Sequence, residues 1–169
     1  MVPDPARRRR LFNRSVRERV EQMKNLFQVV NQGASVAAII ALERELSTEL
    51  PFSYKKLLRV SDGVEWAIHD TGGDCLCLWS SEELIELNEA YQIQHWLPET
   101  LAIGSDGGGD AILFDRRPFD RPDEWPVVRV GFGVLDRDEF VLQANNFESW
   151  VRKEFRLLEA PPPEFPTIL

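Results

Sequence analysis

The sequence predicts an α+β fold, a single domain in which helices flank a central antiparallel sheet. Residues 42–63 (LERELSTELPFSYKKLLRVSDG) read as two short helices, separated by a proline and ended by a glycine. Residues 103–115 (IGSDGGGDAILFD) read as a strand, a glycine-rich reversal and a second strand. Helices come first, a run of antiparallel strands with one inserted helix follows, and a helix closes the chain. This order is typical of the α+β class.

The length and composition describe an ordinary globular chain. At 169 residues it is expected to form one domain, which would bury about two-thirds of its unfolded surface. No stretch approaches the ~20 apolar residues of a membrane span. No apolar segment follows the arginines at 7–10, so a secretory signal is not expected. Two cysteines give no disulfide framework, which favours a reducing, cytoplasmic location.

Charge is divided unevenly along the chain. Residues 1–24 carry eight Lys or Arg against three Asp or Glu, a net charge of +5, whereas residues 25–169 carry 12 against 25, a net charge of −13. An acidic body repels nucleic-acid backbones and attracts cationic proteins. A surface suited to a basic protein is one interpretation, and acidity that only keeps the protein in solution is the other.

The N-terminal segments are expected to lie outside the main domain. Residues 1–13 have the composition of a basic, flexible arm, with two prolines and four consecutive arginines. Residues 14–33 predict an amphipathic helix, and Gly33 suits its C-terminal end. This helix could pack on the domain or form a homodimer through its apolar stripe, which comprises Val16, Val20, Met23, Phe27 and Val30.

Two further helices are predicted before the first strand. Ser35 suits the N-cap of a helix over 36–46. Pro51 suits the first turn of the next helix, because N–H groups in that turn have no partner within the helix. Asp62 and Gly63 are expected to end it.

The pattern then changes to strands with one helix between them. Ser80 and Glu83 form a capping box for a helix over 82–91. Asn146 suits the N-cap of a final helix over 147–155, and the proline-rich tail 158–169 is expected to be extended or loose. Strands are predicted at 64–69, 74–79, 101–104, 111–115, 127–132 and 140–144.

The glycine-rich reversal could be mistaken for an anion or cation site. A glycine-rich phosphate-binding loop is followed by a helix, whose N-terminus holds the anion. Here Gly107, Gly108 and Gly109 precede a predicted strand, and the negative charges of Asp106 and Asp110 flank them. The twelve-residue loop of a calcium site is absent from the sequence. A simple reversal of the chain is therefore the expected role.

Catalytic and metal sites have little support. Cys75 and Cys77 lie two apart on a predicted strand and read as small buried residues rather than as a disulfide or a zinc site. Nucleophilic catalysis requires a base, and only His69 and His95 are available. Carboxylates are abundant by composition, so no acid–base pair is assigned. No catalytic residue, metal or cofactor is predicted, and an enzyme is the minor interpretation.

The basic N-terminus allows a different kind of partner. The arginines at 7–10, with Arg14, Arg17 and Arg19, could contact nucleic acid or anionic lipid. Nucleic-acid readers usually carry a basic folded face, so the acidic body is not expected to bind nucleic acid. An arm that folds back on this body is an equal alternative.

Several short motifs follow one another in an order found in a known superfamily. They are Leu50-Pro51, Ser61-Asp62-Gly63, Leu87-Asn88-Glu89, the reversal at 103–110 and the stretch 146–151. On these pieces, residues 35–157 resemble the SUKH superfamily, whose founding members include a yeast cell-wall-synthesis regulator. Ser47-Thr48 stand where that superfamily usually has a glycine.

The resemblance implies an α+β domain that binds proteins and has no enzymatic activity. Bacterial members look like immunity proteins encoded beside polymorphic toxins, many of them nucleases, and other members look like regulatory interaction modules. The positions that match family motifs, for which the resemblance implies structural roles, are Pro51, Asp62, Gly63, Gly104, Asp106, Gly107 and Gly109.

We therefore expect an immunity protein that masks the basic active-site surface of a cognate bacterial toxin of the nuclease class. The alternative is a regulatory interaction module without a toxin partner. The partner is expected to be that toxin or another basic protein. Trp125 is expected to be an exposed anchor, beside the acidic contact residues Asp115, Asp120, Asp123 and Glu124. A solvated loop between strands is the competing interpretation of this stretch.

Overall fold

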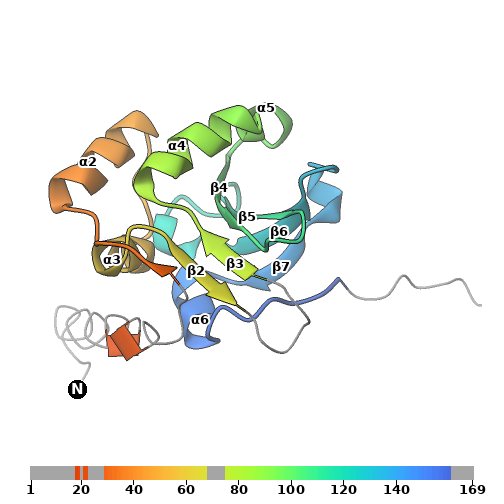
Figure 1. Cartoon of the computed structure of the whole chain (residues 1–169). Helices are drawn as coiled ribbons and strands as arrows, with labels where there is room; N and C mark the ends of the chain where they lie inside the picture. The colour runs from red at the N-terminus through yellow and green to blue at the C-terminus, as the bar shows by residue number, and fades with distance from the viewer. Residues whose placement is uncertain (1–17, 20, 23–28, 68–74, 161–169) are drawn as a thin grey trace, which may run out of the picture.

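The computed structural model describes residues 18–19, 21–22, 29–67 and 75–160. Within this part of the chain, seven strands form one antiparallel sheet whose strand order is the sequence order (Figure 1). The strands are β1 (Val29–Val30), β2 (Val64–Ala67), β3 (Cys75–Leu78), β4 (Thr100–Ser105), β5 (Asp110–Asp115), β6 (Val127–Gly131) and β7 (Val141–Ala144). The predicted α+β class and central antiparallel sheet are confirmed.

Helices lie on both sides of this sheet. In Figure 1, α4 and α5 lie above the sheet and α6 lies below it. The helices are α2 (Val36–Glu45), α3 (Phe52–Val60), α4 (Ser81–Ala90), α5 (Ile93–Trp96) and α6 (Phe147–Arg152), and the short 3-10 helices are η2 (Pro122–Glu124) and η3 (Arg137–Glu139). In the part of the chain that the structure describes, no helix is long and apolar enough to cross a membrane.

Local side chains account for three helix starts. The Ser35 hydroxyl accepts a hydrogen bond from the Ala38 backbone N–H in the first turn of α2. Ser80 and Glu83 form the predicted capping box of α4, and Asn146 caps α6. Each cap satisfies an N–H group that the first helical turn leaves unpaired, so these starts follow from the sequence.

The first predicted helix does not extend as far as expected. Residues 29–30 form strand β1, which pairs with β2, so a helix over 14–33 is wrong at its C-terminal end. Gly33 has a steric role instead, because a Cβ at this position would collide with the carbonyl group of Arg59. The predicted arm at 1–13 lies outside the described residues.

Other boundaries differ by smaller amounts. The closing helix α6 ends at Arg152, because Glu154 and Phe155 adopt the left-handed conformation with φ of 53° and 55°. The short helix α5 was not predicted, and it begins after Gln92, whose φ is 53°. The turn expected between β2 and β3 and the tail after residue 160 lie outside the described residues.

The main core lies between the sheet and helices α3 and α6. The ring of Tyr54 on α3 meets those of Phe114 on β5 and Phe147 on α6 edge to face, with centroids 5.4 and 5.1 Å apart. All three side chains are fully buried. On α4, Asn88 is also buried, and its amide bonds both the N–H and the C=O of Ala102 in β4. These contacts fix the helices on the sheet.

A buried cation ties the end of the described chain to the sheet. Arg129 on β6 pairs with Asp106 and Asp110, at 3.4 Å each, and with Glu159 at 2.9 Å. It also donates to the carbonyl group of Leu158. Residues 154–160 therefore pack against the sheet through charge-assisted hydrogen bonds.

Candidate interaction surface

Trp125 does not form the exposed anchor that the sequence predicts. It is only 4% exposed, its ring lies 6.1 Å from that of Phe114, and its Nε1–H donates to the Phe119 carbonyl at 2.9 Å. This part of the prediction is wrong, because Trp125 lies two residues before β6 and its side chain faces the interior of the domain. Its indole supports the connection between β5 and β6 from the interior of the domain and does not face a partner.

Asp115 is also buried, with 6% of the residue exposed. Its carboxylate pairs with Arg117 at 3.2 Å and with Arg137 at 3.3 Å. Burial by itself raises the pKa of Asp115, but the hydrogen bonds from Arg117 and the charges of both arginines outweigh burial and hold the pKa below its ordinary value. Asp115 is therefore a buried carboxylate whose negative charge is paired with two arginines of the same chain. The expectation that it is an accessible contact residue is wrong.

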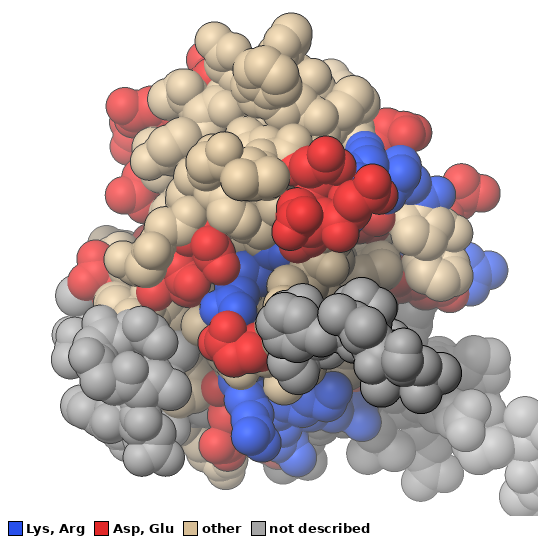
Figure 2. All heavy atoms as spheres, turned by 90° about the vertical axis from the view of Figure 1, so that its right-hand side faces the viewer, with Lys and Arg blue, Asp and Glu red and all other residues tan. Residues whose placement is uncertain are grey.

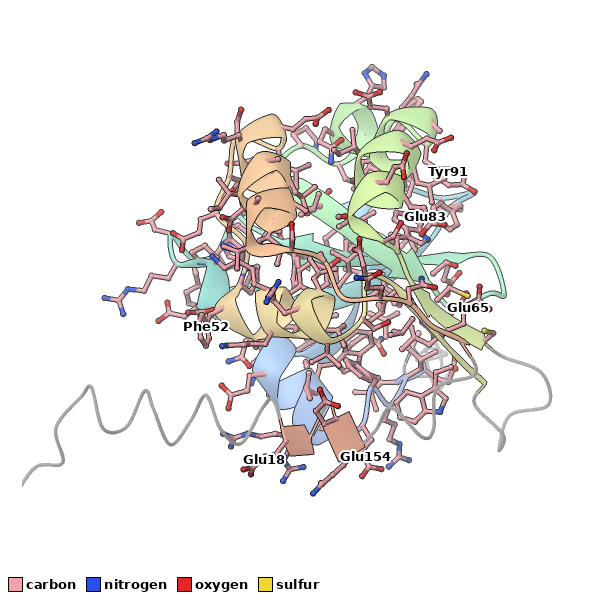
Figure 3. The ribbon with its side chains drawn as sticks, turned by 60° about the vertical axis from the view of Figure 1, so that its left-hand side comes forward. Glu18, Phe52, Glu65, Glu83, Tyr91 and Glu154 are labelled. Carbon is pink, nitrogen blue, oxygen red and sulfur yellow. The ribbon has the colours of Figure 1, made fainter. Side chains whose placement is uncertain are left out.

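Asp123 is exposed but already has a partner within the protein. Its Oδ1 accepts a hydrogen bond of 2.5 Å from the backbone N–H of Phe52, the first residue of α3 (Phe52 is labelled in Figure 3). The N-cap residue, Pro51, offers no side-chain hydrogen bond. Asp123 therefore caps α3 from 71 residues away in the sequence.

The accessible part of the predicted stretch is smaller than expected. Asp120 and Glu124 are exposed, and Glu124 has a loose ion pair of 3.7 Å with Arg121. Phe119 is 44% exposed beside them. We call Phe119, Asp120 and Glu124 the acidic loop. These side chains face solvent on the connection between β5 and β6, which also carries the exposed side chains of Arg117 and Arg121.

Most of the residues assigned to family motifs lie at two connections of the sheet, whereas Gly104 lies within β4 and Pro51 precedes α3. The Asp62 carboxylate accepts hydrogen bonds of 2.7 Å from the backbone N–H and the hydroxyl of Ser81, which ties the end of α3 to the start of α4. The Asp106 carboxylate accepts from the N–H groups of Gly108 and Asp110 across the reversal. A Cβ at Gly104 would collide with the carbonyl group of Cys77 on β3.

The other glycines of the reversal and of the helix end have unusual backbone angles. Gly63, Gly107 and Gly109 have φ of 86°, 72° and 114°, values that side chains other than hydrogen disfavour. These positions shape the connections that Asp62 and Asp106 hold together.

Cys75 and Cys77 are free thiols on the same side of β3. Their sulfur atoms lie 3.5 Å apart, and both residues are half-buried. Burial, followed by the hydrogen bond with Cys75, raises the pKa of Cys77 to about 12. Among the residues that the structure describes, no group of three or more His, Cys, Asp or Glu side chains is arranged to hold a metal ion.

A second surface was missed by the sequence analysis. Trp96, at the end of α5, is 58% exposed, and Val134, in the loop between β6 and β7, is 57% exposed. Phe132 leads into this loop and stacks on Tyr91 at 4.3 Å, and Tyr91 in turn stacks on Trp79 at 6.5 Å. We call the hollow lined by Trp96 and residues 132–136 the apolar groove.

The apolar groove and the acidic loop lie apart on the molecule. Figure 3 shows Tyr91, beside the groove, and Phe52, beside Asp123, on opposite sides of the domain. Figure 2 shows uncharged side chains over the upper part of the face that carries α5, with Asp and Glu side chains grouped below them and Lys or Arg side chains beside that group. The sequence carried one signal of the groove, the aromatic residue Trp96 within a polar segment. The sequence pattern did not indicate which residues would lie beside this tryptophan in the folded chain.

Comparison with known proteins places both surfaces inside one family domain. Residues 33–153 match the model of the SMI1 / KNR4 family (SUKH-1). The match spans α2 to α6 and every described strand except β1. No curated protein matches the chain.

Proposed function

The chain belongs to the SMI1 / KNR4 family (SUKH-1), and from that premise we propose that it is a non-enzymatic, protein-binding immunity protein. In this proposal it binds a cognate bacterial toxin of the nuclease class and covers the basic surface that would hold the substrate. Bound protein and nucleic acid would compete for the same positive charges on the toxin.

The observation that carries this proposal is how charge is distributed over the fold. Residues 25–169 contain 12 Lys or Arg against 25 Asp or Glu. Within the part of this range that the structure describes, six cations form ion pairs with carboxylates of the same chain. Arg129 and Arg137 are turned toward internal carboxylates. The remaining excess of carboxylates gives the domain a negative field that steers a cationic protein toward it.

The acidic loop is the first contact surface in this proposal. Asp120 and Glu124 supply accessible charge, and Phe119 supplies the exposed aromatic ring that was expected of Trp125. The hydrogen bond from the Trp125 indole to the Phe119 carbonyl holds this connection in place. A pre-positioned loop loses less conformational entropy on binding than a mobile one.

Growth rescue is the direct test. The product of the neighbouring gene, which the proposal identifies as the toxin, is expressed with the full chain, and wild-type protein is expected to restore growth. The double variant Asp120→Lys, Glu124→Lys is expected to weaken rescue and to reduce affinity for the purified toxic domain by about tenfold or more.

A single charge reversal outside the acidic loop provides the control, compared per reversed charge. Glu154 is exposed on another part of the domain, labelled in Figure 3, and Glu154→Lys is expected to leave rescue unchanged. Equal loss in both variants would show a general charge effect rather than a loop contact. Failure of wild-type protein to bind or to rescue would overturn the immunity role and favour a regulatory interaction module.

A further inference from the structure

The apolar groove has a rigid wall on the side of α5. Ile93 and Leu97 lie four residues apart, and both are fully buried, so they pin this short helix to the domain. Trp96 lies between them in sequence and projects outward, where its ring packs edge to face on His95 at 4.8 Å. An exposed tryptophan on a fixed backbone is a common anchor at protein interfaces.

The opposite wall is the loop between β6 and β7. Its turns are closed by hydrogen bonds from Val134 N–H to the Gly131 carbonyl and from Asp136 N–H to the Val134 carbonyl, at 3.0 and 2.9 Å. Phe132 is held from below by its stack on Tyr91. The hollow between the two walls has a volume of about 500 Å³, enough to admit side chains of another protein.

An acidic run begins at the edge of the apolar groove and continues along the chain into η3. Asp136 lines the groove, and Asp138 and Glu139 follow on η3, all three exposed. Arg137 lies within this run, but its guanidinium turns inward to Asp115 and donates to the Pro98 carbonyl. The loop therefore presents three carboxylates to solvent, while its one cation is paired with Asp115.

We propose, resting on the function proposed above, that the apolar groove receives an apolar side chain from a basic segment of the partner. The exposed side chains of Trp96 and Val134 suit an aliphatic or aromatic anchor, and the carboxylates of Asp136, Asp138 and Glu139 suit Lys or Arg residues next to that anchor on the side of the loop between β6 and β7. A second copy of this chain fits less well, because a symmetric contact would bring the same acidic runs together.

Peptide binding tests the groove without any toxin. The probes are a six-residue peptide with two leucines between pairs of lysines and a twin with glutamates in place of the lysines. The readout is the NMR resonance of the Trp96 indole N–H, identified among the five tryptophans by the Trp96→Phe variant. The basic peptide is expected to shift this resonance in a saturable manner, and the acidic twin is expected to leave it unchanged.

A groove-filling variant provides a sharper test than removal of Trp96 alone. A Cβ at Gly133 would have no atom within 4 Å and needs no left-handed backbone, so Gly133→Phe is expected to fold while it occupies the groove. Gly133→Phe and Trp96→Ser are both expected to weaken binding of the basic peptide by about tenfold or more. The control is Val36→Ser, which removes an equally exposed apolar side chain from the distant start of α2.

Three outcomes would overturn the inference. They are no shift of the Trp96 resonance with the basic peptide at millimolar concentration, equal shifts with both peptides, and a shift that appears on concentrating the protein alone, which would mean self-association. The same variants are then tested for binding to the toxic domain. Wild-type binding that Gly133→Phe and Trp96→Ser leave intact would reject the groove while the immunity role stands.

Discussion

Asp115 and Arg137 join the end of β5 to the loop between β6 and β7, with Oδ1 of the carboxylate 3.3 Å from Nη1 of the guanidinium. The pair has two consequences. It fixes the loop that forms one wall of the apolar groove, and it pairs the one cation of residues 132–139 with a buried carboxylate. Asp115 therefore acts on the interaction surface from inside the domain.

Asp115→Asn is expected to lower the free energy of unfolding at pH 7 by about 2 kcal/mol, the size of a charge-assisted hydrogen bond. The folded-state pKa of Asp115 lies below its ordinary value. Its stabilisation is therefore present above the unfolded pKa and is lost as pH falls through the folded one. Urea unfolding at pH 7 and at about pH 2 measures both effects, and the variant is expected to approach wild type in acid.

Asp120→Asn is the control for this prediction, because Asp120 is exposed on the same connection. It is expected to change stability by less than about 0.5 kcal/mol at either pH. A difference between wild type and Asp115→Asn that stays constant with pH would contradict the ion-pair account.

The cap that Asp123 provides for α3 gives a second prediction. Asp123→Ala is expected to cost about 1 kcal/mol of stability, because the Phe52 N–H loses its acceptor. Chemical denaturation measures the loss, and Asp120→Ala serves as the matched carboxylate removal. Equal stability of the two variants would show that the 2.5 Å contact does not support the helix.

A substitution of Trp125 tests whether this side chain belongs to the core or acts as a surface anchor. Trp125→Ala is expected to lower stability by about 3–5 kcal/mol, since a buried indole packed on Phe114 is removed. Thermal unfolding gives the measurement, with Phe119→Ala as the exposed aromatic control. An unchanged melting temperature for Trp125→Ala would restore the indole to the surface role that the sequence suggested.

Removal of the Tyr54 hydroxyl group is expected to increase the stability of the domain. Its hydroxyl is buried and has no hydrogen-bond partner among the described residues, and burial raises the pKa of the phenol well above its ordinary value. Tyr54→Phe keeps the edge-to-face contacts with Phe114 and Phe147 and removes the unsatisfied group. We expect the free energy of unfolding to rise by about 1 kcal/mol in urea denaturation, and a loss of that size would show that the hydroxyl has a partner.

The fold could be predicted from the sequence because its signals are local. Ser35, Ser80 and Asn146 cap helices within three residues of themselves, and the strands alternate with recognisable turns. Strand β1 was missed because residues 29–30 continue the apolar spacing of a helix and become a strand only by pairing with β2.

The candidate site could not be predicted in the same way, because contacts between distant residues decide it. Asp123 accepts a hydrogen bond from Phe52, which lies 71 residues away in the sequence, and Asp115 accepts one from Arg137, which lies 22 residues away. Asp115 and Asp123 are the same residue type as the exposed Asp120 and lie on the same stretch, so the sequence alone does not distinguish the buried or capping carboxylate from the exposed one. Trp96 acquires its neighbours from a loop more than 30 residues later, so the apolar groove exists only in the folded chain.

The dependence of association on salt tests the central claim most directly. The rate constant for binding of the full chain to the product of the neighbouring gene, the proposed toxin, is measured from about 50 to 500 mM NaCl, where screening of surface charge becomes nearly complete. If charge complementarity brings the two together, the association rate constant falls by about tenfold or more while the dissociation rate constant changes little. An association rate constant that does not depend on salt, or no association at any salt concentration, would contradict the account.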